Sequence, residues 1–306
     1  MSGIITTGSI PKALWPGVKQ MWGMEYEGHP LEHLDLFDKT TSDQAYEEYV
    51  QVTDFPMAPV KQQGASTVYA GHQQGFVTRL TNVQYGLGYI VTYEEMKNNL
   101  YMKVAKRRTA SLAFAFRTTK ETVAANVYNR AFNASYTGGD GKELLATDHP
   151  NTSGGTWSNE LATPADLSEA AIEDLIIQIM GATTDAGHAM ALKPRCLIVP
   201  RQLWFEANRI YRSVLQNDTA NNATNVLRDT NAFPDGIKVN HYLDDADAWF
   251  IRTNIPAETG LIYQEREAIV FDQDNDFDTK NFKAKGYEDY VFGWVDPRAL
   301  YGSAGA

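Results

Sequence analysis

The sequence predicts an α+β protein, because its helical and strand-rich segments occupy separate stretches of the chain. Residues 89–137 contain neither glycine nor proline and carry apolar side chains at helical spacing. Residues 55–93 are rich in Gln, Thr, Gly, Val and Tyr, and residues 261–301 are also strand-rich. A compact unit of mixed helices and strands separates the long helix from the last strands, and this order favours an α+β fold.

The composition excludes several classes of protein. The 306 residues are 43% hydrophobic and 21% charged, which predicts a globular protein with a core and not a disordered chain. The net charge of -11 gives the whole protein no bulk attraction for nucleic acid. Cys196 is the only cysteine, so no intrachain disulfide can form. We expect neither a signal peptide nor a membrane span, because no sufficiently long apolar run is present.

Residues 1–35 predict an extended arm. They are rich in Gly, Pro, Trp and Met and show little periodicity. Trp15 and Trp22 are too apolar for a solvated tail, so the arm should lie on a surface of its own subunit or of another.

Residues 55–93 predict a long hairpin with its tip near Gly71. The flanks at 66–69 and 76–83 carry β-branched and aromatic residues, and Gly86 and Gly88 suggest a bend or bulge in the second arm. A lone hairpin with few large aliphatic residues is marginal in water. We therefore expect something outside the hairpin to hold it.

The clearest element is a helix over residues 94–132. Its apolar residues recur mostly at steps of four or of seven to eight, while basic residues fall mainly off that stripe. One continuous helix would be ~55 to 60 Å long at ~1.5 Å per residue. Such a helix either spans the whole molecule or breaks near Arg107, Arg108 and Thr109.

The compact unit follows a turn-rich segment at 138–155. Ser168 is expected to cap a helix that stops at Gly181, and 196–199 form a buried strand followed by a helix after Pro200. Residues 217–231 form a polar loop with five Asn. Further strands are expected at 237–242, 249–253, 268–271, 281–285 and 287–295.

Acidic residues alternate at Asp272, Asp274, Asp276 and Asp278. Phe277 and Lys283 stand where an EF-hand calcium loop requires Gly and Glu, so this run is not an EF-hand. Four carboxylates on one side of a strand would repel each other. Either they form a subunit contact with basic residues such as Arg79, Arg107 or Arg108, or they form a solvated acidic loop.

Chemical motifs are weak elsewhere. His29 and His33 are four residues apart, but Pro30 disfavours a regular helix between them, so a packed or solvated arm is a better interpretation than a metal site. The segment 138–142 lacks the spacing of a phosphate-binding loop, and the chain has no nucleophile elbow. We therefore expect no catalytic residue, no metal and no cofactor.

Three segments resemble one family of proteins. Residues 167–172 and 191–200, with the run Lys193-Pro194 … Val199-Pro200, resemble the helix and strand of the A-domain of the Hong Kong 97 capsid fold. Residues 277–298 resemble the closing strands of its P-domain, and the length and ending are similar to the Mu-like major head subunit. The order of elements carries the resemblance, which covers almost the whole chain.

The resemblance implies a domain plan and a function. The plan is an N-terminal arm (1–50), an E-loop hairpin (51–93), a P-domain with a spine helix (94–165), an A-domain (166–258) and P-domain return strands (259–306). It implies a major capsid protein of a tailed bacteriophage that forms pentamers and hexamers of an icosahedral shell around double-stranded DNA. The Asn-rich loop would face the centre of each capsomer. The family's chemical crosslink does not transfer, because Lys61 lies in the hairpin without a matching Asn or Glu.

The implied partners are other copies of the chain, a portal protein and DNA bound without sequence specificity, and whether a decoration protein joins them is left open. No charged helical region precedes the arm, so the scaffolding protein is expected to be separate. Assembly is expected in the host bacterial cytoplasm, with no membrane involved.

Two other functions remain open. One is a related encapsulin-like shell that encloses a cargo enzyme, and the other is an α+β enzyme that would form only a small oligomer. Under the capsid interpretation, ten residues are candidates for contacts between subunits: Trp15, Trp22, Lys61, His72, Arg79, Arg107, Arg108, Asp272, Asp274 and Asp276.

Overall fold

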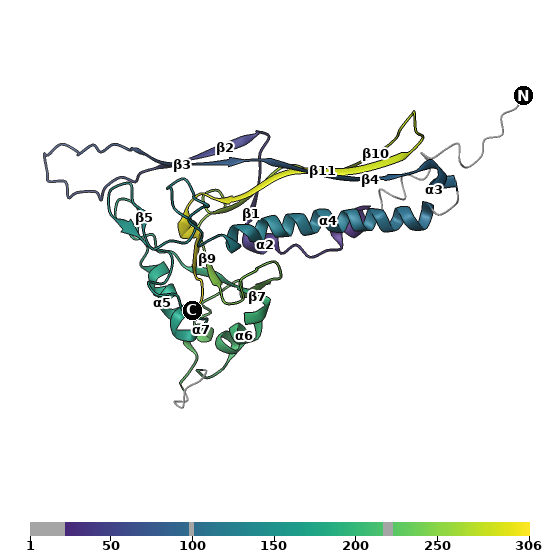
Figure 1. Ribbon diagram of the computed structural model, residues 1–306. Helices are drawn as coiled ribbons and strands as arrows, with labels where there is room; N and C mark the ends of the chain where they lie inside the picture. The colour runs from purple at the N-terminus through teal and green to yellow at the C-terminus, as the bar shows by residue number, and fades with distance from the viewer. Residues whose placement is uncertain (1–21, 98–100, 217–222) are drawn as a thin grey trace, which may run out of the picture.

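The structure is a computed structural model that describes residues 22–97, 101–216 and 223–306. A long sheet and a long helix run side by side, a loop projects from one end of them, and a compact unit extends to one side (Figure 1). None of the helices in these described ranges combines the length and the apolar composition needed to cross a membrane.

The long sheet is built on a hairpin of two strands, β10 (Leu261–Asn275) and β11 (Phe282–Trp294). Strand β1 (Asp38–Thr41) pairs in parallel with β10, and β4 (Val83–Val91) pairs antiparallel with β11, giving the order β1-β10-β11-β4. At ~3.3 Å per residue, β10 extends for ~50 Å. The predicted strands 268–271, 281–285 and 287–295 are therefore parts of two longer strands, which cross-strand pairing makes continuous.

The long helix α4 (Tyr101–Asn129) packs against this sheet, and a short helix α3 (Tyr93–Lys97) precedes it. The break considered near Arg107–Thr109 is absent, because helical structure continues through those residues. Whether α3 and α4 join depends on residues 98–100, which lie outside the described residues. At ~1.5 Å per residue α4 is ~43 Å long.

The helix is held against the sheet by two groups of buried side chains. Near its first half, Leu112 and Phe116 pack with Phe271 and Phe282 of the sheet. Near its end, Tyr128 joins the main core of the molecule. The apolar stripe predicted from the sequence therefore faces the sheet and the compact unit, and the helix is the spine that joins them.

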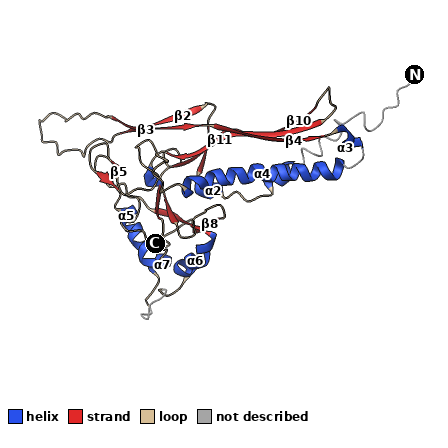
Figure 2. Ribbon diagram, viewed as in Figure 1, coloured by secondary structure: helices blue, strands red, loops and turns tan. Residues whose placement is uncertain are grey.

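The hairpin has a different first arm from the predicted one. Strand β2 (Tyr46–Val52) pairs antiparallel with β3 (Gln74–Thr81), whereas residues 66–69 form no strand. The hairpin therefore begins before the predicted boundary at residue 51. Residues 53–73, which we call the projecting loop, extend away from the rest of the chain without strand partners (Figure 2).

The predicted bend at Gly86 and Gly88 is also wrong. Strand β4 keeps an unbroken register with β11 through Gly86↔Tyr287 and Gly88↔Lys285. The reason for glycine at position 88 is close approach, because a Cβ there would lie 2.7 Å from the backbone oxygen of Ala284. A strand glycine can therefore mark a tight contact without a bulge.

The compact unit is built on a four-stranded sheet with the order β12-β9-β7-β8. These strands are β7 (Pro194–Pro200), β8 (Ile237–Asn240), β9 (Trp249–Thr253) and β12 (Leu300–Ser303). Helix α5 (Glu169–Met180) begins at Ser168, whose side chain accepts a hydrogen bond from the N–H of Ala171, as predicted. Its C-cap is Gly181, also as predicted.

The remaining elements of the unit are short. They are η3 (Arg201–Leu203), α6 (Trp204–Arg212) and α7 (Val226–Asp229), with β5 (His149–Pro150) and β6 (Thr156–Trp157) at its border, α2 (His33–Leu36) beside the spine and η4 (Pro297–Ala299) before β12. Because β12 pairs with β9, the end of the chain returns to the compact unit. The last strand of the predicted return segment 259–306 therefore pairs within the compact unit, and the division of the chain into domains stays a prediction.

Candidate subunit-contact surfaces

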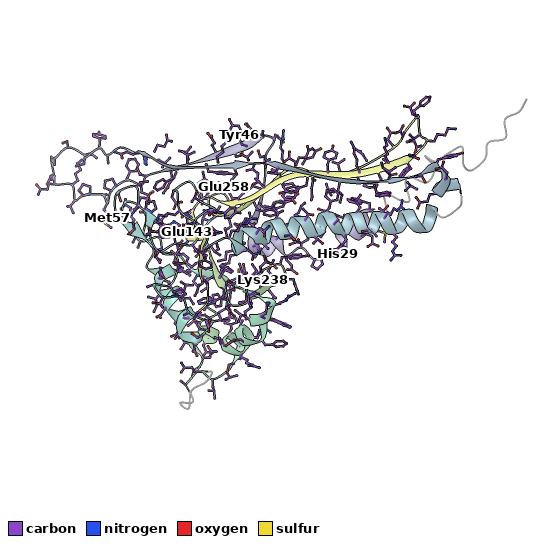
Figure 3. The ribbon with its side chains drawn as sticks, viewed as in Figure 1. His29, Tyr46, Met57, Glu143, Lys238 and Glu258 are labelled. Carbon is purple, nitrogen blue, oxygen red and sulfur yellow. The ribbon has the colours of Figure 1, made fainter. Side chains whose placement is uncertain are left out.

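The projecting loop exposes apolar side chains that make few contacts with their own subunit. Val60 is 95% exposed, Tyr69 is 92% exposed and Met57 is 73% exposed. Figure 3 shows Met57 on this loop, away from the side chains that fill the compact unit. Lys61, a predicted contact residue, lies in the same loop and is exposed. An apolar surface of this kind is stable when another surface covers it.

The base of the loop is fixed by hydrogen bonds. A ring nitrogen of His72, Nδ1, lies 2.7 Å from the backbone oxygen of Thr53, and the ring centroids of His72 and Phe55 are 3.8 Å apart. His188 of the compact unit places its Nε2 2.6 Å from the backbone oxygen of Phe55. His72, a predicted contact residue, therefore closes the neck of the loop within its own chain.

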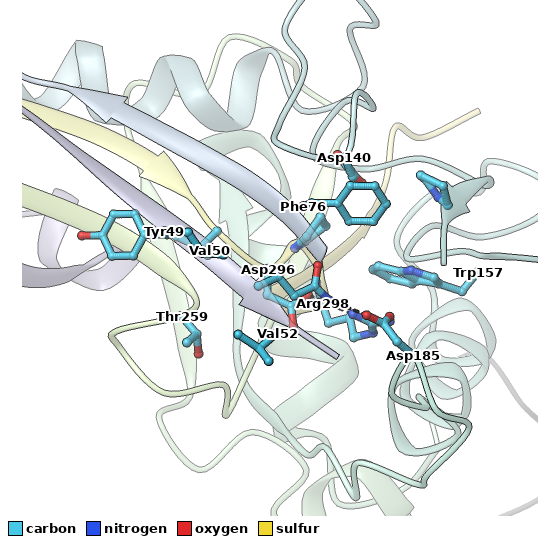
Figure 4. A pocket seen from close by; sticks show the side chains of 14 residues that line it. Tyr49, Val50, Val52, Phe76, Asp140, Trp157, Asp185, Thr259, Asp296 and Arg298 are labelled. Carbon is cyan, nitrogen blue, oxygen red and sulfur yellow. Dashed lines mark hydrogen bonds and ion pairs between the residues drawn. The ribbon is translucent and has the colours of Figure 1, made fainter. Parts of the chain in front are cut away.

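A cavity of about 390 Å³ lies where strands β2 and β3, at the base of the loop, meet the compact unit. Inside it Arg298 stacks 4.2 Å from the Trp157 ring centroid and lies 3.4 Å from a carboxylate oxygen of Asp185, as Figure 4 shows. The amide of Gln51 donates to the other oxygen of Asp185 at 2.6 Å, and the Thr152 hydroxyl donates to that oxygen too.

These contacts tie strand β2 to the compact unit through one carboxylate. Burial raises the pKa of Asp296, which also contacts Arg298. The charged side chains in the cavity thus mostly contact one another. Their contacts with strand β2 fix the position of the loop that follows it. Sequence reasoning missed this cluster, because Gln51, Asp185 and Arg298 are far apart in the chain and belong to no motif.

The far tip of the long sheet is a second exposed surface. Phe277 is 96% exposed in the turn between β10 and β11. Asp276 closes that turn, since its Oδ1 accepts from the N–H of Asp278 and its Oδ2 accepts from Lys283 Nζ at 2.5 Å. The Lys283 hydrogen bond, with those backbone bonds, keeps the pKa of Asp276 below its ordinary value.

Contrary to the expectation from the sequence, the four alternating aspartates do not lie together on one face of a strand. Strand β10 ends at Asn275, so Asp276 and Asp278 belong to the turn. Asp272 and Asp274 are directly opposite Lys285 and Lys283 of β11. These lysines reduce the repulsion between the carboxylates, but Lys283 forms its ion pair with Asp276, and Asp272 and Asp274 stay without an ion pair in the described part of their own subunit.

The predicted basic partners have neighbours within their own chain. Arg79 places its guanidinium carbon 3.6 Å from the Tyr46 ring centroid, and Arg108 donates to both carboxylate oxygens of Glu95. Arg107 is exposed on α4. The structure of one subunit does not bring these arginines together with Asp272 or its neighbours, and contact across an interface stays a prediction.

Trp22 is buried in its own subunit. Its ring stacks 4.7 Å from that of Phe271 and lies edge-on to Phe116 at 5.8 Å. This part of the arm therefore packs on an apolar surface of its own subunit, formed by the sheet and the spine helix. Trp15 falls outside the described residues, and its contact stays a prediction.

His33 has a structural environment and not that of a metal ligand. It is 3% exposed and its Nδ1 lies 2.5 Å from a carboxylate oxygen of Glu121 on α4. Among the residues that the structure describes, no group of His, Cys, Asp and Glu is arranged to hold a metal ion.

Helix α6 gives the compact unit an exposed apolar surface of its own. Trp204 and Phe205 are 48% and 68% exposed, and their rings lie 5.0 Å apart. The nearby Asn-rich loop lies partly outside the described residues, at 217–222. Each end of the subunit therefore presents apolar side chains: the projecting loop, the sheet tip and the compact unit.

Comparisons with known proteins agree with this architecture. A model of the family described as "Phage capsid protein" matches residues 77–303. No curated protein sequence matches the chain. Among solved structures, the virus-like particle from Pyrococcus furiosus has a TM-score of 0.54 at 12% identity and covers 94% of this chain and 98% of its own.

Two phage structures are also similar. A structure from Mycobacterium phage Patience has a TM-score of 0.53 at 11% identity, covering 99% of this chain and 92% of its own. One from Mycobacterium phage Che8 has a TM-score of 0.51 at 14% identity, covering 88% and 89%.

A spine helix along a long sheet, a projecting loop and a compact unit define a shell-forming subunit with the Hong Kong 97 capsid fold. The fold predicted from the sequence is confirmed. The chain belongs to the phage capsid protein family, whose model covers most of its length. It is a major capsid protein that assembles with copies of itself into the shell of a virion.

Proposed function

We propose that this subunit forms pentamers and hexamers of an icosahedral shell around phage double-stranded DNA, and that its projecting loop lies on a neighbouring subunit. The observation that carries the proposal is the exposure of Val60 and Tyr69, on a loop that the described residues of its own chain leave uncovered. In a closed lattice every copy can cover the loop of its neighbour, so many weak contacts add together.

The finer features of the proposal follow from the resemblance. The length and ending of the chain support a Mu-like major head subunit. The domain plan of arm, E-loop, P-domain and A-domain is retained, with the E-loop beginning at β2. A separate scaffolding protein, a portal, a decoration protein in some capsids and assembly in the host cytoplasm complete the proposal. The net charge of -11 fits a container wall that does not adhere to its DNA.

Deleting residues 57–70 tests the proposal. The full chain and the deletion variant would be expressed with and without the scaffolding protein and studied by size-exclusion chromatography and negative-stain imaging. We expect closed shells from the full chain and folded small species from the variant, because the deletion leaves both buried clusters intact. Closed shells of normal size from the variant would contradict the role of the loop.

A compartment shell that encloses a protein cargo is the second candidate, since the fold also matches the virus-like particle from Pyrococcus furiosus. The contents of purified particles distinguish the two functions. Particles from infected cells that contain nuclease-protected DNA support the capsid, whereas particles that contain a stoichiometric enzyme support the compartment. A genome in which portal and terminase genes adjoin this gene would also favour the capsid.

A further inference from the structure

Strand β4 is an unprotected sheet edge. It lies at the end of the order β1-β10-β11-β4, and its nine residues, VQYGLGYIV, carry no charge and no proline. Val83, Leu87 and Ile90 are 47%, 52% and 56% exposed. Natural proteins usually protect such an edge with charges, prolines or a bulge, because its backbone groups attract another strand. None of these devices is present in β4.

The edge is open along most of its length. The register with β11 is regular from Val83 to Val91, so β11 uses one side of the strand throughout. Among the described residues, a side chain reaches this backbone at Ile90, whose oxygen accepts from Arg108. Residues 83–89 therefore keep a free edge that another strand can join.

The projecting loop contains a segment that favours a strand but has no strand partner. Residues 66–70, Ser-Thr-Val-Tyr-Ala, have no charge and no proline, and their composition predicts a strand. The structure gives them no strand, although Val68 and Tyr69 are 70% and 92% exposed. A strand requires a partner for its backbone groups, and the part of one subunit that the structure describes offers none at this position.

The segment cannot reach β4 of its own chain. The projecting loop lies at one end of the molecule, and β3 separates it from β4, which runs toward the opposite end (Figure 1). At ~3.3 Å per residue the eight residues of β3 span ~26 Å. A second copy of the chain must therefore supply any pairing between the two segments.

We propose that residues 66–70 of one subunit pair as an added strand with the free edge of β4, at residues 83–89, in the next subunit. Main-chain hydrogen bonds hold such an added strand, so the contact depends little on side-chain identity. Because the two surfaces differ, the contact is head-to-tail, and its repetition forms a ring when the rotation between subunits closes, as a pentamer or hexamer requires. This inference rests on the proposed function and specifies where the loop lies.

Cysteine crosslinking tests the pairing. The native Cys196 is 2% exposed, so crosslinks report the engineered thiols. Thr67→Cys and Val68→Cys would each be combined with Leu87→Cys, because neighbouring strand residues point to opposite faces. Assembled shells would be treated with a short bismaleimide. We expect ladders of linked chains from at least one pair, and none from the control Val60→Cys with Leu87→Cys.

Proline substitution tests the backbone contribution. Thr67→Pro and Val68→Pro each remove an N–H group, and one of the two points toward the partner strand. We expect at least one variant to need about tenfold more protein to assemble, whereas Val60→Pro assembles like the wild type. Thermal unfolding of the unassembled subunits checks that all three fold normally.

The outcomes separate this inference from the proposed function. Normal assembly of both proline variants, with no ladder from either cysteine pair, would overturn the pairing. If deletion of residues 57–70 still prevented assembly in that case, the wider role of the loop would stand. Ladders from Trp15→Cys with Leu87→Cys in place of the loop pairs would assign the edge to the N-terminal segment, and would also overturn the pairing.

Discussion

Lys120 of α4 and Glu288 of β11 form an ion pair with 2.6 Å between Nζ and Oε2, and the two side chains are only 5% and 0% exposed. The hydroxyl of Tyr26 lies 3.2 Å from the same carboxylate oxygen and 3.1 Å from Lys120 Nζ. Arm, spine helix and sheet therefore meet at one buried polar cluster, and the packing of the three depends on it.

Removing one member of this pair should destabilise the subunit strongly. Lys120→Ala leaves the Glu288 carboxylate buried without its cation, and we expect the free energy of unfolding to fall by about 3 to 5 kcal/mol. Lys142→Ala is the control, because its pair with Asp148 is exposed to solvent, and it should leave the stability nearly unchanged. Urea unfolding of unassembled subunits measures both. A loss below about 1 kcal/mol for Lys120→Ala would contradict the prediction.

Two glycines of β4 should differ sharply in their tolerance of alanine. Gly88→Ala places a Cβ 2.7 Å from the Ala284 oxygen, so we expect it to destabilise the subunit by about 1 to 3 kcal/mol. Gly86→Ala meets no atom closer than 3.9 Å and should be neutral or slightly stabilising. Thermal unfolding of the two variants measures this difference. Equal losses of stability would show that the close approach of the Ala284 oxygen does not require glycine at position 88.

The thiol of Cys196 should be inert in the folded subunit. Burial raises its pKa from 9.0 to about 11, so the thiol stays protonated at pH 8 to 9, where a free cysteine begins to ionise. A disulfide reagent should label it only after unfolding, whereas the exposed control Val60→Cys should react at once. Rapid stoichiometric labelling of the native wild type would refute this.

The same raised pKa has a consequence at alkaline pH. The folded state holds the thiol proton more tightly than the unfolded state. The contribution of Cys196 to the free energy of unfolding is therefore fully present below pH 9 and is lost between pH 9 and about 11. A pKa difference of about two between the folded and unfolded states corresponds to about 2 to 3 kcal/mol. Unfolding of the wild type and of Cys196→Ala across this range should show a smaller alkaline loss in the variant.

Charge reversal at Asp274 tests the sequence hypothesis of an acidic subunit contact. Lys283 already forms an ion pair with Asp276, so Asp274 and Asp272 are the aspartates available to another chain. If they contact basic residues there, Asp274→Lys should slow assembly at low salt, and high salt should reduce the difference by screening. Glu258→Lys is the exposed control, and Figure 3 shows its position away from the sheet tip. Light scattering during assembly measures both, and identical rates at every salt concentration would remove the hypothesis.

The sequence by itself determined which segments are helices and strands where local signals are strong. The glycine- and proline-free stretch gave the spine helix, Ser168 and Gly181 bounded α5, and Val199-Pro200 marked the strand and helix of the compact unit. These features follow from backbone chemistry and from the spacing of apolar residues, and both are local. The order of the segments was enough to indicate the fold.

Only the tertiary structure decided the pairing of segments that are distant in the chain. It gave β2 and not residues 66–69 as the partner of β3, and it placed Lys283 and Lys285 opposite the aspartates of β10. It also brought Gln51, Asp185 and Arg298 into one cavity at the base of the loop. Strand partners and buried charge clusters depend on which surfaces meet after folding, and no local pattern of residues records that.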